Sequence, residues 1–394
     1  MSPAIIVLAF NRPKALERLL GSLAAAEYHQ KAKLIISLEG GATKEVISIS
    51  RKFECKLLDV EIIEREEKLG LRAHVIACAD LSEKYNSVII LEDDLIVDRY
   101  FYSYASAALD FYEKDHSVAG IALYSYEYNE FANLPFRSMA NGFSTYLMQI
   151  PCSWGQCWTA SQWKAFKYWY KDKTKADLEK IDRLPHAVKN WPESSWKKYF
   201  HGFMIERQKN FIYPYQSYST NCSDAGGEHI KDGSFIHQVA MATPARPEPK
   251  FNFSPSENYE VAYDSFMEPC GDFIQRAIGF TPKEVEIDIH GIKPLSILKS
   301  KPYAVTVQKG GTPLCIYSYD FKPTEVNLLF PNLKNHGDFC LLSTSFLTGR
   351  ADRECSIKRY NYYAGMNLIS LGFILNFFCT TAKKIINKFM RNDR

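Results

Sequence analysis

Long apolar runs are missing from this chain of 394 residues, and their absence excludes one class of protein. No stretch reaches the roughly 18 to 20 apolar residues that a helix needs to span a bilayer. The chain starts with MSPAIIVLAF, which has no basic segment ahead of its apolar run. We therefore expect neither a transmembrane helix nor a secretory signal peptide.

An excess of charge of one sign is also missing. Lys and Arg total 48 against 45 Asp and Glu, which gives a formal net charge of +3. A dedicated nucleic-acid-binding protein normally has a strong basic excess, so we do not expect that class. The ten cysteines lack the paired spacing of a zinc site, since Cys152 and Cys157 stand five apart. We interpret the cysteines as reduced thiols of a cytoplasmic protein.

Apolar residues make up 46% of the chain, enough for a sizeable core, and the first quarter alternates strand-like with helix-like segments. Expected strands cover residues 4–10, 33–38, 56–63 and 87–91, and expected helices cover residues 14–26, 44–53 (with Thr43 as N-cap) and 71–85. This order predicts the α/β class, with a mostly parallel sheet flanked by helices. Ligands of such sheets bind at the carboxyl ends of the strands, where the loops with Arg12, Glu39 and Glu92 should gather.

The pattern changes beyond residue 91. We expect a helix at residues 100–114, a strand at 117–124, an aromatic turn at 154–158, a helix at 161–170 and a short strand at 210–214. Short β-like runs recur at residues 285–289, 303–308, 314–319, 326–330 and 339–342. The expected domains are an α/β domain at 1–243, a proline-rich linker or wrap at 244–283, a β-rich accessory region at 284–350 and an apolar helical tail with a basic end at 351–394. That tail would lie on an anionic membrane surface or dock on its own protein.

Three consecutive acids, Glu92-Asp93-Asp94, follow the apolar run SVIIL. Buried acids are costly unless a positive group joins them. Mg²⁺ and Mn²⁺ prefer oxygen ligands and are often shared between one or two carboxylates and the phosphates of a substrate. A helix N-terminus decorated with acids is the other explanation. The place at a strand end favours a metal that neutralises a diphosphate.

Four motifs stand in a recognisable order: VLAFNRPKALERLLGSL, IISLEGG, REEKLGLRAH and VIILEDDLIVDRYF. Their order resembles that of GT-A-fold glycosyltransferases, both the N-acetylglucosaminyltransferase I type and family 2-like bacterial transferases of surface polysaccharides. The resemblance covers roughly residues 3–240. It implies inverting transfer of a sugar from a nucleotide-sugar, expected to be UDP-linked, to a hydroxyl of a glycan or lipid-linked glycan.

The resemblance also implies roles for single residues. Arg12 would contact the donor phosphates, and Arg72 would lie by the diphosphate. Glu39 would lie near the nucleobase and Asp93 near the ribose, with Glu92 beside them. Asp94 would bind Mn²⁺ or Mg²⁺ directly. The loop NCSDAGGEHI resembles the family's closing loop, where His229 would be a second metal ligand unless it is merely exposed or structural. The segment WGQCWTASQW resembles the aromatic stretch beneath the acceptor.

One position departs from the family pattern. Inverting transfer needs a general base for the acceptor hydroxyl. Related enzymes supply it with a Trp-Asp pair, whereas the matching stretch here is Trp196-Lys197-Lys198. Glu193 is the base that we predict instead, with Glu206 as the second choice.

Two other functions stay open at this stage. A sugar nucleotidyltransferase shares the acids and the sheet, but it would normally need a glycine-rich phosphate loop that AFNRPK does not provide. A nucleotide-sugar-binding scaffold that has lost its base is favoured by Lys197. Further along, EIDIHGIKP loosely resembles the tails of bacterial surface-polysaccharide transferases. Together with the basic tail, it indicates work at the cytoplasmic face of a membrane.

Overall fold

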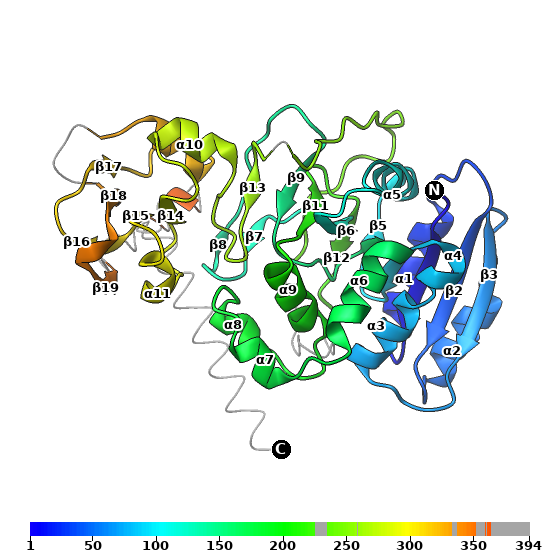
Figure 1. Cartoon of the computed structure of the whole chain (residues 1–394). Helices are drawn as coiled ribbons and strands as arrows, with labels where there is room; N and C mark the ends of the chain where they lie inside the picture. Colours follow the sequence, from blue (N-terminus) through cyan, green and yellow to red (C-terminus); the bar gives the residue numbers. More distant parts are fainter. Residues whose placement is uncertain (225–234, 258, 333–336, 352–358, 360, 364–394) are drawn as a thin grey trace, which may run out of the picture.

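The computed structural model describes residues 1–224, 235–257, 259–332, 337–351, 359 and 361–363. Its main body is a nine-stranded sheet (Figure 1). In spatial order, the strands are β13 (Ala262–Tyr263), β9 (Thr145–Met148), β11 (Asn210–Pro214), β6 (Val118–Ala122), β10 (Gln156–Thr159), β4 (Ser87–Glu92), β1 (Ala4–Ala9), β2 (Ala32–Leu38) and β3 (Leu58–Glu64).

One half of this sheet is parallel. β1 lies between β2 and β4 and pairs in parallel with both, and β3 extends this half beyond β2. β10 enters between β4 and β6 and runs antiparallel to each. β11 is parallel to β6 and antiparallel to β9. The predicted α/β class and the mostly parallel sheet are confirmed.

Helices cover both faces of the sheet, because alternate side chains of its central strands are apolar on both sides. Ile5 and Val7 of β1 join one core with α1 and α5, whereas Ile6 and Leu8 join the other with α3, α6 and α9. The helices of this body are α1 (Pro13–Ala24), α2 (Lys44–Lys52), α3 (Leu71–Ala79), α4 (Ser82–Tyr85), α5 (Phe101–Phe111), α6 (Ala160–Tyr170), α7 (Lys175–Glu179), α8 (His186–Lys189) and α9 (Trp196–Glu206).

Local signals set the helix ends. Pro13 opens α1, a position where the missing N–H of proline costs nothing. The Thr43 hydroxyl accepts a hydrogen bond from the backbone N–H of Val46, which confirms the predicted N-cap of α2. The helix expected over residues 71–85 is instead two helices, α3 and α4. They part at Asp80, whose carboxylate accepts hydrogen bonds from Trp163 and Lys167 of α6.

The aromatic turn expected at residues 154–158 is confirmed for residues 154–155, which form a bend, and is wrong from residue 156 onward. Residues Gln156–Thr159 form β10, a central strand of the large sheet. Trp158 is fully buried and packs on the rings of Trp163 and Phe200. These residues adopt the strand conformation because they pair with β4 and β6. Both partner strands are distant in the sequence, so local sequence patterns do not indicate the pairing.

The carboxyl-terminal part forms a smaller β-rich lobe beside the β13 edge of the sheet (Figure 1). Its four-stranded sheet has the order β14 (Val285–Asp288), β15 (Tyr303–Thr306), β18 (Phe339–Ser343) and β17 (Cys315–Tyr317). The other elements of the lobe are β16 (Gln308–Gly310), β19 (Leu347–Ala351), α10 (Asp272–Ile278), α11 (Leu295–Leu298), η1 (Thr324–Leu329) and η2 (Thr344–Phe346).

Residues 326–330 were expected to be a strand, but they lie mostly within the 3₁₀ helix η1. Asn327 explains the difference, because its side chain forms hydrogen bonds with the backbone of the residues that precede it. The amide donates to the carbonyl oxygens of Phe321 and Thr324, and its oxygen accepts from the backbone N–H of Asp320. These bonds compete with strand pairing.

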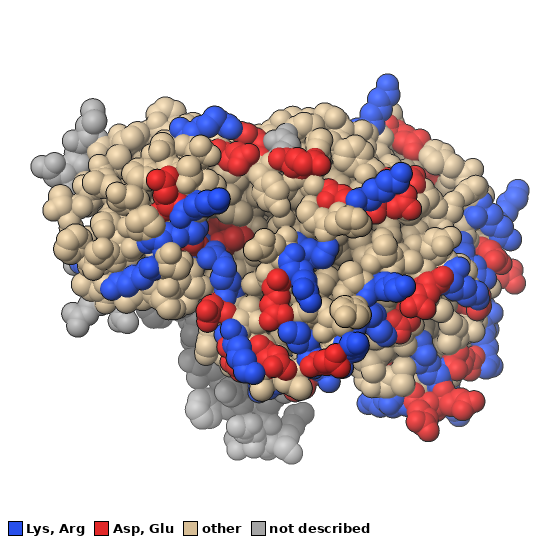
Figure 2. Space-filling view, in the orientation of Figure 1, with Lys and Arg blue, Asp and Glu red and all other residues tan. Residues whose placement is uncertain are grey.

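Two further strand pairs lie near the main sheet: β5 (Leu95–Val97) with β12 (Ser219–Asn221), and β7 (Tyr128–Asn129) with β8 (Leu134–Pro135). In the part of the chain that the structure describes, every helix is too short or too polar to cross a membrane. Most of the predicted tail, residues 352–358, 360 and 364–394, lies outside the described residues. Figure 2 shows Lys and Arg intermixed with Asp and Glu over the visible face.

Candidate active site

A cavity of about 750 Å³ opens at the carboxyl ends of β1 and β4. Because these strands are parallel neighbours, with Leu8 opposite Glu92, the loops that follow them meet at one edge. Arg12 comes from the loop after β1, and Glu92, Asp93 and Asp94 end β4 and follow it. The expected gathering of these residues is therefore confirmed. A cavity of this size suits a small-molecule ligand.

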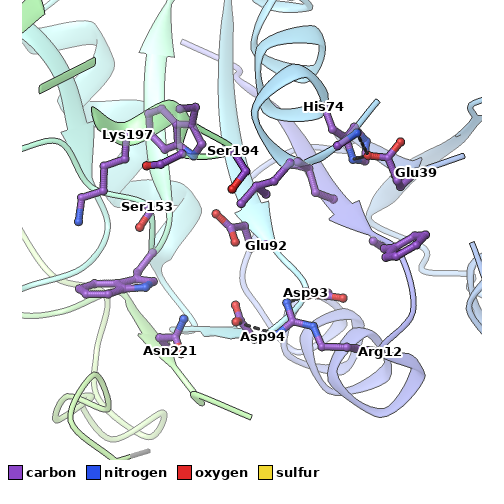
Figure 3. Close-up of a pocket in the computed structure, with 18 of the residues that line it drawn as sticks. Arg12, Glu39, His74, Glu92, Asp93, Asp94, Ser153, Ser194, Lys197 and Asn221 are labelled. Atoms are coloured by element: carbon purple, nitrogen blue, oxygen red, sulfur yellow. Dashed lines mark hydrogen bonds and ion pairs between the residues drawn. The ribbon is translucent and has the colours of Figure 1, made fainter. Parts of the chain in front are cut away.

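Arg12, Asp93 and Asp94 form one group, the strand-end cluster (Figure 3). The Arg12 guanidinium donates to Asp93 and, at 3.0 Å, to Asp94 Oδ2. Burial raises the pKa of Asp93 to about 6, with Asp94 adding to the rise and Arg12 opposing it. Asp94 Oδ1 is buried and accepts no hydrogen bond from any described residue. One arginine thus donates hydrogen bonds to two carboxylates, and Asp94 Oδ1 remains an acceptor without a donor in the described part of the chain.

That leftover oxygen suits a divalent cation, since carboxylate oxygen is the ligand that Mg²⁺ and Mn²⁺ prefer. The second predicted ligand, His229, lies outside the described residues. Within the described ranges, no group of three or more His, Cys, Asp or Glu side chains is arranged to hold a metal. A metal here would therefore depend on few protein ligands, as is common where substrate phosphates complete the shell.

Glu39 follows β2 and lines the same cavity, but its carboxylate already has partners. It accepts from the backbone N–H groups of Gly40, Leu69 and Gly70 at 2.9, 2.8 and 3.0 Å. The His74 ring lies 3.6 Å away, and burial lowers the His74 pKa to about 4, so that this ring is neutral near pH 7. Glu39 therefore fixes the loop before α3 as part of the cavity wall.

Arg72 and Glu193 are predicted site residues that do not line the cavity. They pair with each other at 3.4 Å, and the Arg72 guanidinium lies over the ring of Tyr199. Glu193 is about half exposed and accepts hydrogen bonds from Lys198 at 2.7 Å and from the Tyr199 hydroxyl at 2.8 Å. The hydrogen bond from Lys198 is the main cause that lowers the pKa of Glu193, which weakens it as a base.

Glu206, the second predicted base, also lies away from the cavity lining. Its carboxylate accepts from Trp169 Nε1 at 2.6 Å and from Lys173 Nζ at 2.8 Å. Glu92 does line the cavity, and Figure 3 shows it between the Arg12 side and the Lys197 side.

The wall opposite Arg12 holds residues that sequence reasoning missed as site residues (Figure 3). Lys197 Nζ lies 3.5 Å from Glu130 Oε1 and 3.2 Å from the Tyr126 hydroxyl. The same ammonium lies over the rings of Trp154 and Trp191, at 5.0 and 5.2 Å from their centroids. No motif marks Glu130 in the sequence. The signals for this wall were Lys197, which stands where an acid was expected, and Trp154 of the segment WGQCWTASQW.

His237 also belongs to this wall. Its ring lies against that of Trp154, with 4.5 Å between the centroids, and burial lowers its pKa. The wall thus combines aromatic faces, a lysine, an acid and a histidine.

Comparisons with known proteins agree with this picture. Residues 4–163 match the family model described as Glycosyl transferase family 2. None of the curated proteins matches the chain. The matched residues include β1 to β10 and the strand-end cluster, and the predicted enzyme class, a glycosyltransferase, is confirmed.

A search of solved structures finds TarS of S. aureus in complex with UDP, at 12% identity and a TM-score of 0.36, covering 56% of this chain and 60% of that chain. TarS 1-349 of S. aureus in complex with UDP-GlcNAc has 13% identity and a TM-score of 0.38, covering 59% and 62%. The mannosyltransferase PcManGT from Pyrobaculum calidifontis, in complex with GDP-Man and Mn²⁺, has 13% identity and a TM-score of 0.33, covering 52% and 69%. The chain thus spans less than two thirds of the length of the TarS chains, and likenesses this low do not bear on function.

Proposed function

We propose that this enzyme transfers a sugar from a nucleoside diphosphate sugar bound against the strand-end cluster, since residues 4–163 match the family model described as Glycosyl transferase family 2. One observation carries the proposal. Asp93 and Asp94 share a single arginine at the floor of a cavity large enough for the donor, and Asp94 keeps an unpartnered oxygen there. Acids left short of positive charge favour binding of a cation.

Each residue of the cluster has a proposed task. Asp94 would hold Mn²⁺ or Mg²⁺, which when bound supplies charge neutralisation to the leaving diphosphate. Arg12 would donate to the phosphate oxygens, for which a guanidinium is well suited. Asp93 and Glu92 would orient the donor from the same strand end. Arg72 and Glu39 are supported less, because Arg72 is outside the lining and Glu39 is engaged by backbone.

The finer parts of the proposal rest on the resemblance of the motifs. They are a UDP-linked donor, inversion at the anomeric carbon, and a glycan or lipid-linked glycan acceptor of bacterial surface polysaccharide. The apolar tail with its basic end supports work at the inner face of a membrane, in peripheral contact with it.

Calorimetry with UDP and Mn²⁺ tests the central role of Asp94. In Asp94→Ala, we expect Mn²⁺-dependent UDP binding to weaken by roughly a hundredfold or more, because the metal contributes several kcal/mol of charge stabilisation. The matched control is Asp172→Ala, which removes an exposed aspartate and should bind like the wild type. Equal affinity in Asp94→Ala and the wild type would refute the assignment.

A second candidate function is donor binding without transfer, favoured by Lys197 in the place of an acid. Slow metal-dependent release of UDP from its proper donor separates the two functions, because a working transferase shows it and a scaffold does not.

A further inference from the structure

The wall of the cavity that faces the strand-end cluster carries an acid of its own. Glu130 lines the cavity and is 18% exposed at its side chain. Lys197, in the first turn of α9, points its ammonium toward Glu130 Oε1 at 3.5 Å and is 9% exposed. A lysine held this way donates hydrogen bonds and has no acceptor to offer. Glu130 is therefore the group of this pair that can take a proton.

The backbone holds Glu130 in a fixed place. It sits between β7 and β8, in a tight turn closed by the fully buried Asn129. Asn129 Oδ1 accepts from the backbone N–H groups of Phe131 and Ala132 at 3.0 and 2.9 Å, and its carbonyl oxygen accepts from the N–H of Asn133. These three bonds hold the turn that carries Glu130 in one backbone conformation.

Several other acids of the cavity are already engaged. Asp93 and Asp94 pair with Arg12, Glu39 accepts three backbone N–H groups, and Asp224 pairs with Arg18. Glu92 lies in the middle of the cavity, next to Asp93 and Asp94 in the chain. Glu130 differs from them in that it contacts Lys197 of the aromatic wall.

We propose that Glu130 is the general base of this enzyme and that Lys197 is its positioning residue; the proposal rests on the proposed function. The acceptor hydroxyl oxygen forms a bond to the anomeric carbon of the donor sugar. Its proton passes to the Glu130 carboxylate. The bond from the anomeric carbon to the diphosphate oxygen breaks, and the nucleoside diphosphate leaves with the electron pair.

The aromatic frame of this wall supports the same assignment. Trp154 and Trp191 line the cavity, and the Lys197 ammonium lies over both rings. Flat rings of this kind pack against the apolar face of a sugar. An acceptor sugar stacked there would bring a hydroxyl to Glu130, across the cavity from the strand-end cluster. In this arrangement, Lys197 replaces the expected acid on α9, and Glu130 supplies the acid from a different segment.

The test compares three glutamine variants, each measured for donor binding and for transfer. Glu130→Gln should lower kcat by roughly 10²- to 10⁴-fold, the usual contribution of a general base. Its affinity for UDP in the presence of Mn²⁺ should stay within about twofold of the wild type, which also shows that the variant is folded. Glu193→Gln tests the base predicted from sequence. Glu113→Gln, at an exposed position in the turn after α5, is the control.

Lys197 is tested by the split between kcat and KM. Lys197→Met should lower kcat about tenfold or more, with the KM for donor unchanged, because Glu130 then loses the group that orients it. Lys197→Arg should restore most of kcat, since a guanidinium also donates to a carboxylate and packs on indole rings. A purely structural lysine would give no such rescue in kcat at constant donor KM.

The outcomes are distinguishable from failure of the proposed function. If the wild type binds no nucleotide-sugar, the proposed function itself fails. If the wild type binds and transfers, and Glu130→Gln transfers equally well, the inference about Glu130 is overturned. It is equally overturned if the loss of kcat at constant donor affinity falls on Glu193→Gln instead.

Discussion

Two clusters of buried charge in this protein contain the same kinds of group in different proportions. The strand-end cluster has one arginine, Arg12, for two acids. The second group, the bridging cluster, has two acids for three cations. It joins the main body to the β-rich lobe, and its members are Arg183, Asp264, Glu286, Lys293 and Lys301.

The acids of the two clusters respond in opposite ways to burial. Burial raises the pKa of Asp93 to about 6, because one shared arginine does not offset it. Burial also raises the pKa of Glu286, but the attraction of Lys293 and the hydrogen bond from Arg183 outweigh it and hold that pKa well below its usual range. Glu286 is therefore satisfied within the fold, whereas Asp93 and Asp94 are short of one positive charge. A deficit of this kind is what a cation-binding site needs before its ligand arrives.

The largest expected effect comes from breaking the bridging cluster. Lys293→Met leaves Asp264 and Glu286 buried without their central cation, so we expect the free energy of unfolding to fall by about 3–5 kcal/mol. Urea unfolding measures it. Lys299→Met, on the same segment but exposed, is the matched control and should change stability by less than about 0.5 kcal/mol. A loss in Lys293→Met no larger than that of the control would contradict the structural role.

A smaller effect on the free energy of unfolding is expected when one aspartate of each cluster is replaced by asparagine. Asp264→Asn weakens its bonds to Lys293 and Arg183, and we expect a loss of about 2 kcal/mol in the free energy of unfolding. Asp94→Asn removes repulsion from Asp93, so stability should hold or rise, by less than about 1 kcal/mol, while transfer is lost. Thermal and urea unfolding of the two variants give the comparison. If both variants lost stability alike, the two clusters would not differ as we infer.

The two clusters also differ in how visible they are in the sequence. The acids of the strand-end cluster are consecutive residues after an apolar strand, and Arg12 follows the neighbouring strand, so short-range pattern and sheet topology together predict their meeting. The bridging cluster draws on positions from 183 to 301, and no local pattern relates them. Glu130 and Lys197 are separated in the same way.

Secondary structure elements set by short-range sequence patterns could be predicted, whereas elements that depend on distant contacts could not. The strands before residue 92, and the first two helices, follow from periodicity and caps such as Thr43, whereas the break between α3 and α4 does not. β10 could not be predicted this way, because its strand state depends on pairing with β4 and β6. The roles predicted for Arg12, Glu39, Arg72, Glu92, Asp93, Asp94 and Glu193 stay predictions, and so do the expected domain boundaries.

The pH dependence of stability should have opposite signs in the two clusters, with a slope of at most about 1.4 kcal/mol per pH unit for each proton. The pKa of Asp93 rises on folding from 3.8 to about 6. Between these values the folded state binds more protons than the unfolded state, so the Asp93 contribution falls as pH rises. The pKa of Glu286 is lowered on folding, so the stability that Glu286 contributes is present above its usual pKa of 4.5 and is lost as pH falls below that value.

Urea unfolding of the wild type, Asp93→Asn and Glu286→Gln from pH 3 to pH 7 measures the pH slope of each group as the difference between wild type and variant. Because a bound cation would require Asp93 and Asp94 to be ionised, added Mn²⁺ should flatten the Asp93 slope and leave the Glu286 slope unchanged. Slopes of the same sign in both differences would mean that the strand-end acids are as well compensated as those of the bridging cluster.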